Sequence, residues 1–386
     1  MKYVKYKLGD IVTFLNGRAF FMPELQDNGK YRILRVGNLS GGNDSWYYSD
    51  MELDDNKYCE KGDLLYAWAC NFGPHIWKEG KVIFHYHIWK LIENKDKVDK
   101  TYLYYYLLHQ TPFYLGGVNG ATMVHITKKS MEEKTVFIPS SLKVQHRIAS
   151  ILSTYDTLIE NNTKRIRLLE KMAENLYKEW FVRFRFPGHE KVEMENGLPK
   201  GWKVCQLSKI SDYSNCKAPN NKGLFYISTE NMLKEYGGID ETVPSEWPEA
   251  NVTKVDVGDI LVSNIRPYFK KIWLADKEAG CSNDVLNIRA KEGICPIFLY
   301  YSIRRDSFFD HMVAGSNGTK MPRGSKEFTM KYSVIVPSNN VMVEFSRIIE
   351  RLIHNKRTLQ HQNTLLVRQR DLLLPRLMSG KLEVKP

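Results

Sequence analysis

The stretch from Ile148 to Phe181, IASILSTYDTLIENNTKRIRLLEKMAENLYKEWF, carries the most regular pattern in the chain. Apolar residues recur at alternate spacings of four and three, which is the heptad pattern of a helix that packs along another helix. Its seam includes Leu152, Ile159, Asn162 and Ile166, of which only Asn162 is polar. Because no Pro or Gly occurs before Pro187, the pattern predicts an uninterrupted helix about 50 Å long.

A second stretch near the end of the chain has the same spacing, displaced by 200 residues. It predicts a second long helix that ends at Pro375 or at Ser379 and Gly380, with a seam that includes Leu352, Leu359, Gln362 and Leu366. If the two helices are antiparallel, Asn162 and Gln362 meet near their mid-points and fix the register. The alternative is that both amides are solvated at the edge of a looser seam.

The similarity between the two halves extends beyond the helices. KLGDIVTF (7–14) matches QLSKISDY (206–213), and KGDLLYAW (61–68) matches VGDILVSN (257–264). NGATM (119–123) also matches NGTKM (317–321), and the offset stays between 196 and 200. One unit, a globular domain followed by a long helix, therefore occurs twice.

Each globular part is predicted to be α+β, because short alternating stretches typical of strands are mixed with helical ones such as TYLYYYLLHQ (101–110). The expected fold is two mixed α/β domains separated by two long antiparallel coiled-coil helices, with an internal pseudo-twofold repeat. The predicted segments are a first domain over 1–141, a helix over 142–186, a linker over 187–201, a second domain over 202–338, a second helix over 339–378 and a tail over 379–386.

The composition indicates a folded protein with an anionic partner. The chain has 386 residues, 43% hydrophobic and 12% aromatic, with a net charge of +12. Charge alone leaves nucleic acid, an acidic protein and a membrane surface open. Six scattered cysteines without a CxxC pair indicate reduced thiols of a cytoplasmic protein, with a zinc site as a minor alternative. No apolar run is long enough to span a bilayer.

Motifs for catalysis are missing from the sequence. It has no Gly-rich phosphate loop, no adenine-methyltransferase box, no GxSxG elbow and no HExxH helix. His85 and His87 alternate on a predicted strand and could face a ligand, but two such histidines more often form a half-buried face. The sequence therefore predicts a chain that is not an enzyme by itself and holds no metal.

Binding features are richer, and they fall in two loops at matched places of the repeat. The first is SNIRPYFKKIW (263–273), with AWACNFGPHIW (67–77) as its counterpart; the second is GSNGTKMPRGSK (315–326), with GGVNGATMVHITKK (116–129). Arg and Asn suit guanine and adenine edges, and Lys suits phosphates. Taken singly, each residue is most simply a solvated loop residue, but the matched placement favours nucleic-acid binding.

The predicted DNA contacts are drawn from both domains. They are Arg18, Asn38, Asn71, His75, Thr122 and Lys128 in the first domain, and Asn231, Asn264, Arg266, Tyr268, Lys270, Lys271, Asn317, Thr319, Lys320 and Arg323 in the second.

Four motifs carry a resemblance to a known family: FIPSSLKVQHRIASIL (137–152), LYKEWFVRF (176–184), GLPKGWKVCQLSKI (197–210) and RQRDLLLPRLMSGKL (368–382). With the repeat, they make nearly the whole chain resemble the specificity (S) subunit of type I restriction-modification systems. One departure concerns the family's Pro-Pro-x-x-Glu-Gln stretch, of which Gln145 remains in the first copy while the second has lost its Gln.

The resemblance implies two target-recognition domains that each read one half of a bipartite double-stranded DNA site. The helices would set the spacer and dock two modification (methyltransferase) subunits, which restriction (translocase and nuclease) subunits join. S-adenosylmethionine, ATP and Mg would be held by these partners, with no cofactor on this chain. Two other readings remain open, namely a free-standing coiled-coil interaction protein and a fragment of a fused restriction-methylation enzyme.

Overall fold

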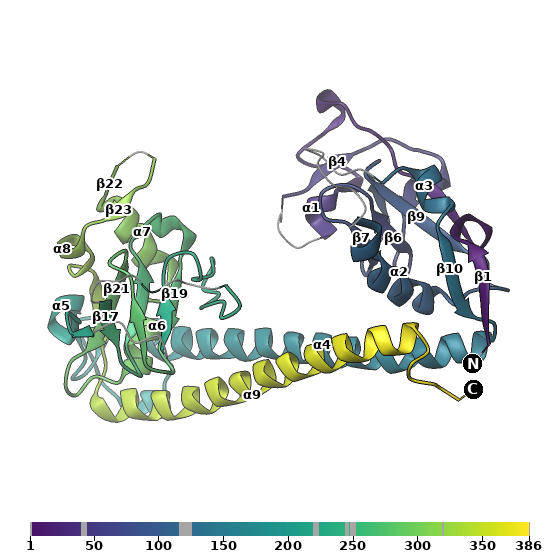
Figure 1. Ribbon diagram of the computed structural model, residues 1–386. Coiled ribbons are helices and arrows are strands. Elements are labelled where there is room, and N and C mark those ends of the chain that lie inside the picture. Colours follow the sequence, from purple (N-terminus) through teal and green to yellow (C-terminus); the bar gives the residue numbers. More distant parts are fainter. Residues whose placement is uncertain are drawn as a thin grey trace. The chain divides into compact units, whose positions relative to one another are not determined.

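The computed structural model describes residues 2–39, 45–115, 126–218, 224–243, 247, 252–318 and 320–385. The chain forms two compact units (Figure 1). Unit 1 consists of residues 1–163 with 361–386, and unit 2 consists of residues 164–360. Both long helices therefore contribute one part to each unit.

Unit 1 is built on two four-stranded sheets. The main sheet is antiparallel, in the order β2 (Val12–Asn16), β9 (Ile88–Glu93), β6 (Leu64–Ala67), β7 (Gly73–Ile76). The second has the order β4 (Tyr47–Ser49), β3 (Tyr31–Leu34), β8 (Val82–Phe84), β5 (Tyr58–Cys59), with β3 and β8 parallel. The other elements are β1 (Tyr3–Lys7), paired with β10 (Thr135–Pro139), and α1 (Val36–Leu39), α2 (Lys100–Leu115), α3 (Lys128–Glu132), η1 (Leu8–Asp10), η2 (Met22–Glu24) and η3 (Asp55–Lys57).

Unit 2 has a main sheet of the same order and directions: β14 (Ser211–Tyr213), β21 (Val285–Ala290), β18 (Ile260–Ser263), β19 (Ile272–Leu274). Its second sheet also contains one parallel pair, in the order β15 (Lys217–Ala218), β17 (Val252–Val255), β20 (Ala279–Cys281), β16 (Phe225–Ile227). The remaining strands form the pairs β13 (Lys203–Gln206) with β24 (Ser333–Val336), β11 (Met194–Glu195) with β12 (Leu198–Pro199), and β22 (Ser316–Asn317) with β23 (Arg323–Gly324). Its short helices are α5 (Leu207–Ile210), α6 (Pro296–Ile303), α7 (Asp306–Ala314), α8 (Lys326–Thr329), η5 (His189–Lys191) and η6 (Pro267–Phe269).

The two long helices are α4 (Leu142–Tyr177), continued by the π-helical turn η4 (Lys178–Val182), and α9 (Asn339–Met378). The first helical run ends at Val182, short of Phe186, because Phe184 adopts a left-handed conformation with φ of 57°. The second continues through Pro375, which lies in its last turn, and Gly380 with φ of 73° follows it. Within the described residues, no helix contains a stretch apolar enough to cross a membrane.

The segments of α4 and α9 inside each unit run antiparallel. In unit 1, Arg370 Nη1 pairs with Asp156 Oδ1 at 2.6 Å, and Asn162 Nδ2 lies 3.5 Å from Gln362 Oε1. In unit 2, Lys356 Nζ pairs with Glu170 Oε1 at 2.8 Å. The two amides thus meet, although Asn162 is buried and Gln362 is exposed, which places the pair at the edge of the seam. Of the other seam residues, Leu152 and Leu359 are buried, while Ile159, Ile166, Leu352 and Leu366 are half-buried.

Each hydrophobic core is completed by the start of one long helix and the end of the other. In unit 1 the core includes Ile148 and Leu152 of α4 with Leu374, Leu377 and Met378 of α9. In unit 2 it includes Phe345 and Ile349 of α9 with Tyr177, Trp180 and Phe181 from the α4–η4 run. Each unit therefore needs both helices to cover its apolar face.

The loss of Gln in the second copy of the family motif has a physical explanation. Gln145 is fully buried, where it accepts a hydrogen bond from Asp99 N (2.8 Å) and donates one to Pro139 O (2.8 Å). The residue 200 positions later is Phe345, which is also fully buried and lies against Phe181 with ring centroids 4.9 Å apart. Unit 1 uses a buried amide to satisfy backbone groups, whereas unit 2 fills the corresponding place with an aromatic ring.

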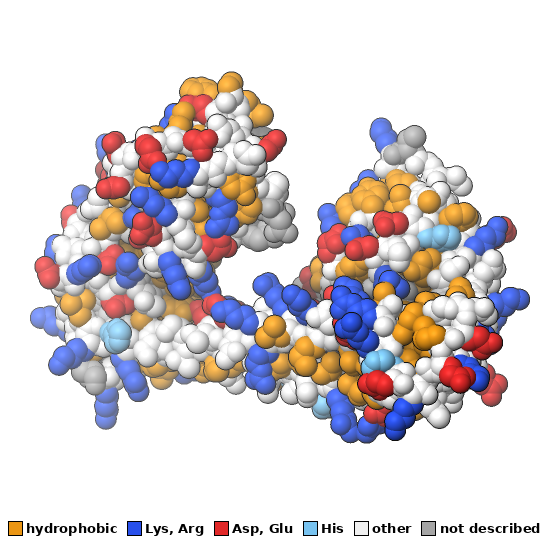
Figure 2. Space-filling model, turned by 180° about the vertical axis from the view of Figure 1, so that it is seen from behind, with side chains coloured by type: hydrophobic (Ala, Val, Ile, Leu, Met, Phe, Trp, Pro, Cys, Tyr) orange, Lys and Arg blue, Asp and Glu red, His pale blue; other side chains and the backbone are white. Residues whose placement is uncertain are grey.

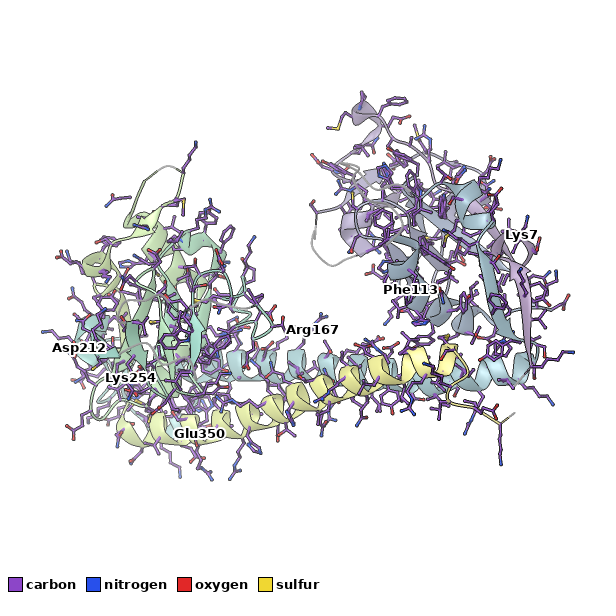
Figure 3. The ribbon with its side chains drawn as sticks, in the orientation of Figure 1. Lys7, Phe113, Arg167, Asp212, Lys254 and Glu350 are labelled. Atoms are coloured by element: carbon purple, nitrogen blue, oxygen red, sulfur yellow. The ribbon has the colours of Figure 1, made fainter. Side chains whose placement is uncertain are left out.

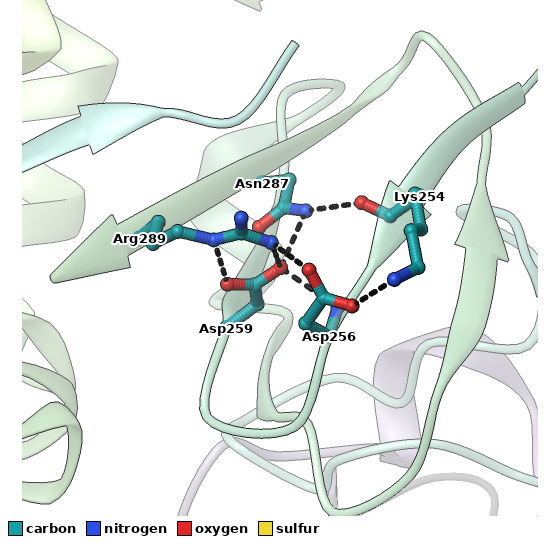
Figure 4. Close-up of polar contacts among 5 residues, drawn as sticks. All are labelled: Lys254, Asp256, Asp259, Asn287 and Arg289. Carbon is teal, nitrogen blue, oxygen red and sulfur yellow. Dashed lines mark hydrogen bonds and ion pairs between the residues drawn. The ribbon is translucent and has the colours of Figure 1, made fainter. Parts of the chain in front are cut away.

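The repeated Gly-Asp motif forms a charged turn just before an inner strand of each main sheet, β6 in unit 1 and β18 in unit 2. In unit 2, Asp259 accepts a hydrogen bond from Asp256 N (2.9 Å) and pairs with Arg289 Nε at 2.7 Å (Figure 4). In unit 1, Asp63 accepts from Glu60 N (2.8 Å) and pairs with Lys90 Nζ at 2.7 Å. Sequence matches at this motif therefore reflect support of the sheet and not contact with a ligand.

Candidate nucleic-acid interface

Several loops meet at one end of the main sheet in each unit. In unit 1, β2 and β6 end where β9 begins, because Asn16 pairs with Trp89 and Ala67 pairs with Ile88. We define loop end 1 as residues 17–24, 68–72 and 85–87. In unit 2, β18 ends where β21 begins, since Ser263 pairs with Val285. We define loop end 2 as residues 264–271 and 282–284 with the hairpin 316–324, of which residue 319 is not described.

Aromatic and imidazole rings dominate the centre of loop end 1. Trp68 Nε1 donates to Tyr86 O at 2.8 Å, and the Trp68 and His87 rings have centroids 5.0 Å apart. The His85 ring lies 4.9 Å from that of His87. Burial, together with the nearby His87 and Arg35, lowers the pKa of His85 to about 4. His85 is therefore a neutral ring at physiological pH.

Two of the predicted contacts in unit 1 are engaged within the fold. Arg18 Nη2 pairs with Glu24 Oε1 at 2.7 Å, and its guanidinium lies 4.9 Å from the centre of the Phe20 ring. Asn38 accepts from Arg35 N (3.1 Å) and donates to Ser45 O (3.0 Å). Both side chains therefore shape the loops beside the interface.

The other predicted residues of unit 1 differ in exposure. Asn71 is exposed, and His75 is half-buried on β7, where burial lowers its pKa. Lys128 lies at the start of α3 and its Nζ is 3.7 Å from Glu132 Oε1. Thr122 lies outside the described residues.

Loop end 2 is held in an unusual backbone conformation. Arg266 and Lys270 flank η6 with φ of 49° and 51°, a region that L-residues rarely adopt. Arg266 N donates to Pro322 O at 2.8 Å, and Gly324 N donates to Asn264 O at 3.1 Å. These two hydrogen bonds connect the η6 loop to the β22–β23 hairpin. Strained backbone that is held in place by surrounding contacts in this way occurs often at binding sites.

Three residues of unit 2 that were predicted as DNA contacts make hydrogen bonds or ion pairs within the unit. Lys270 Nζ pairs with Asp306 Oδ1 at 2.8 Å, and Lys271 Nζ donates to Thr229 O at 2.5 Å. Burial, with a smaller effect of Lys234, lowers the pKa of Lys271. Asn231 is fully buried and caps a turn by accepting from Ser228 N at 3.0 Å. It occupies the same place as Asn38, since both follow the strand that is parallel to its neighbour in the second sheet.

The surface of loop end 2 is polar and cationic. Tyr268 is 47% exposed, and Asn317, Lys320 and Arg323 are exposed. Arg266 is half-buried, and Asn264 is buried with an Oδ1 atom that has no hydrogen-bond partner. Arg323 Nη2 lies 3.1 Å from Asp284 Oδ1. Thr319 lies outside the described residues.

Sequence reasoning did not select Trp68 and Tyr86, although the repeat contained a signal for Trp68. Trp68 N donates to His87 O, and Asn264 N donates to Asp284 O, so Trp68 occupies the place in unit 1 that Asn264 occupies in unit 2. Both residues also stand five positions after the aspartate of the Gly-Asp motif. Trp68 was not predicted, because hydrogen-bonding side chains suggest base contacts more directly than an aromatic ring does.

Across the described residues, no group of three or more His, Cys, Asp or Glu side chains is arranged to hold a metal ion. On the face shown in Figure 2, Lys and Arg side chains lie among Asp and Glu on both units. On this face the charges of the two signs are therefore interspersed.

The fold is similar to that of a solved S subunit of a type I restriction-modification system. The S subunit from M. genitalium superposes with a TM-score of 0.60, at 16% identity, over 97% of this chain and 96% of that one.

Sequence comparisons find similarity to the same class of protein. Residues 1–171 match the family model described as the type I restriction modification DNA specificity domain. The MjaIX specificity subunit of Methanocaldococcus jannaschii is 28% identical over 318 residues, covering 75% of this chain and 71% of that protein. The MjaVIII specificity subunit of the same organism is 25% identical over 403 residues, covering 98% and 92%. The resemblance to type I specificity subunits is thereby confirmed.

Proposed function

We propose that this chain is the sequence-specific DNA-recognition subunit of a type I restriction-modification complex, and that each unit reads one half of a bipartite target. One observation carries this proposal: each unit presents its loops at the corresponding end of its own four-stranded main sheet. The chain is also similar to specificity subunits over nearly its whole length. Two DNA-binding domains in one protein suit a DNA site with two separated halves.

The chemistry of loop end 2 suits direct contact with base edges and phosphates. Arg266 can form a bidentate pair with guanine, and Asn317 can pair with adenine. Lys320 and Arg323 project from the hairpin, where they can neutralise phosphates. Lys270 and Lys271 would hold the loop so that the Tyr268 side chain stays exposed to DNA. They would not contact DNA themselves, because both are bonded within the unit.

Loop end 1 would read its half-site mainly with Asn71, His75 and the rings around Trp68. Neutral rings contact bases through stacking and apolar packing, and they add little to phosphate binding. Unit 1 should consequently contribute less than unit 2 to the salt dependence of DNA binding.

The long helices would set the spacer between the half-sites and dock two modification subunits. Exposed apolar side chains on the helices favour docking of a protein. They include Leu158, Leu365 and Leu372 in unit 1, and Leu168 and Met172 in unit 2. S-adenosylmethionine, ATP and Mg would then be held by the modification and restriction subunits, and this chain would act in the cytoplasm without catalysing a reaction.

The test is co-purification with the modification subunit of the same system, followed by mapping of methylated adenines in a random-sequence DNA library. We expect methylation at one motif with two defined halves and an undefined spacer. The modification subunit alone serves as the control and should give no such motif. A chain that binds neither the methyltransferase nor DNA would instead be a coiled-coil interaction scaffold.

A further inference from the structure

A small apolar tip stands beside loop end 1. Residues 18–24 form a loop that includes η2, and two of its side chains, Phe21 and Met22, are 75% and 74% exposed. No other large hydrophobic side chain in the described part of the chain is as exposed. Single exposed apolar residues are common on protein surfaces, but an adjacent Phe and Met on a projecting turn favours a binding role.

The tip is rigid although its side chains are exposed. Glu24 Oε2 accepts a hydrogen bond from Phe21 N (2.8 Å), and Glu24 Oε1 takes one from Arg18 Nη2 (2.7 Å). The bond from Phe21 N and the pairing with Arg18 lower the pKa of Glu24, which stays ionised. Pro23 restricts the backbone within the turn. Because both carboxylate oxygens are bonded inward, Phe21 and Met22 form the outer surface of the turn.

The base of the tip is fixed to the interface loops. Arg18 N donates to Phe84 O (3.0 Å), and Tyr86 N donates to Arg18 O (2.9 Å). A Cβ atom on Gly17 would lie 2.4 Å from His85 O, so the chain can pass here only because residue 17 is glycine. The tip is thus continuous with the ring cluster of Trp68, Tyr86 and the two histidines.

We propose that Phe21 and Met22 form a wedge that inserts between adjacent base pairs of the half-site read by unit 1; this rests on the function proposed above. Phe, Met and Pro are side chains that unstack base steps and kink DNA. The bound partner is then a deformed duplex, and unit 1 selects for sequence partly through the ease of that deformation. Pyrimidine–purine steps such as TA and CA unstack most readily, so one should lie at the point of insertion.

Unit 2 offers an internal comparison. The segment that follows its first main-sheet strand reads SNCKAPNNKG (214–223) and contains no Phe, Met, Leu or Ile. At this matched place unit 2 has no counterpart of Phe21 and Met22, so we expect the deformation in the half-site of unit 1.

The experiment uses the complex of the full chain with its modification subunit, bound to duplexes of the mapped target. 2-Aminopurine, whose fluorescence rises when it unstacks, replaces a base at the pyrimidine–purine step of the unit 1 half-site or of the unit 2 half-site. The variants are Phe21→Ala with Met22→Ala, the conservative pair Phe21→Trp with Met22→Leu, and the control Phe113→Ala. Phe113 is 67% exposed and projects from α2 of the same unit (Figure 3).

The parent complex should raise fluorescence only in the unit 1 half-site. The double alanine variant should lose this signal and bind about tenfold more weakly, the expected size for one lost stacking contact. The conservative pair and Phe113→Ala should retain both the signal and the affinity. Gel filtration and thermal unfolding of each variant check that the chain still folds and assembles.

Three results would overturn the wedge. If the double alanine variant binds and unstacks DNA like the parent, the tip does not insert, while the proposed function stands. If that variant folds but no longer assembles with the modification subunit, the tip contacts a protein instead. If the parent complex binds no bipartite site at all, the proposed function and the wedge fail together.

Discussion

The two loop ends differ in chemistry although they stand on the same sheet. Loop end 1 combines aromatic and imidazole rings around Trp68 with an apolar tip, and loop end 2 combines a strained Arg266–Lys270 turn with exposed Lys320 and Arg323. The strands beneath them have the same order and directions. Buried positions therefore preserve the framework, and the loops are free to differ, as expected if each unit reads different bases.

Even the shared framework uses different partners in the two units. The Asp259 side chain is 3% exposed and is bonded to Arg289, Asn287 and a backbone N–H, whereas the Asp63 side chain is 21% exposed and is bonded to Lys90 and a backbone N–H. The same turn thus carries a more deeply buried charge in unit 2.

The largest expected effect tests this difference in burial. Asp259→Ala removes a buried carboxylate and leaves Asn287 Nδ2 and Asp256 N without that acceptor, and it should destabilise unit 2 by about 3 kcal/mol. Asp63→Ala should destabilise unit 1 less, because water reaches both members of its ion pair. Urea unfolding of the two variants, followed by proteolysis to identify the opened unit, makes the comparison. Similar small losses in both variants would show that the network in unit 2 is not tighter.

The second effect concerns base recognition. Arg266→Ala should cost about 1–3 kcal/mol in DNA binding if Arg266 makes a bidentate base contact, and should relax the half-site of unit 2 only. His75→Ala serves as the matched variant in unit 1 and should relax the other half-site. Methylation mapping of both variants checks this, and relaxation of both halves by either change would contradict separate reading.

A third prediction distinguishes a lysine that contacts a DNA phosphate from a lysine that stabilises the fold. Lys320→Met should reduce the slope of log K against log salt by about one, because Lys320 is exposed on the hairpin. Lys270→Met should leave that slope unchanged and should lower the stability of unit 2, since Lys270 pairs with Asp306. Binding titrations at several salt concentrations decide between them, and equal slopes for the two variants would remove the distinction.

The smallest effect is a pH dependence confined to unit 1. The pKa of His85 is about 4 in the folded chain, below the usual value of 6.5, so the unfolded chain binds more protons between these values. Unit 1 should therefore lose stability as the pH falls from 6.5 towards 4. His85→Gln should make unit 1 less sensitive to acid, with the exposed His361→Gln as control. Equal acid sensitivity of parent and His85→Gln would contradict this.

The sequence predicted the long helices well because heptad spacing and the absence of Pro and Gly are strong local signals. It also placed the second helix at the observed bounds of α9, Asn339–Met378. The end of the first run was harder to predict, because the helical run gives way to a left-handed Phe184 just before Phe186, which stacks on Trp202 in the core with ring centroids 5.0 Å apart.

Individual site residues were less accessible from the sequence. Asn38 and Asn231 stood at matched positions, and the pattern could not show that both cap turns. The sequence also could not show that Lys270 pairs with Asp306 and that Lys271 donates to Thr229 O. Residue type alone does not distinguish a side chain bonded internally from one that is available to a ligand.

The proposed function requires that the helix pair set the spacing between the two half-sites. The most direct measurement removes residues 159–165 from α4 and the facing residues 361–367 from α9, and then maps methylation by the complex. One heptad shortens each helix by about 10 Å, the length of about three base pairs. The account predicts that both half-site sequences remain and that the spacer becomes shorter, by no more than this amount. An unchanged spacer with full activity, or new bases in either half-site, would contradict it.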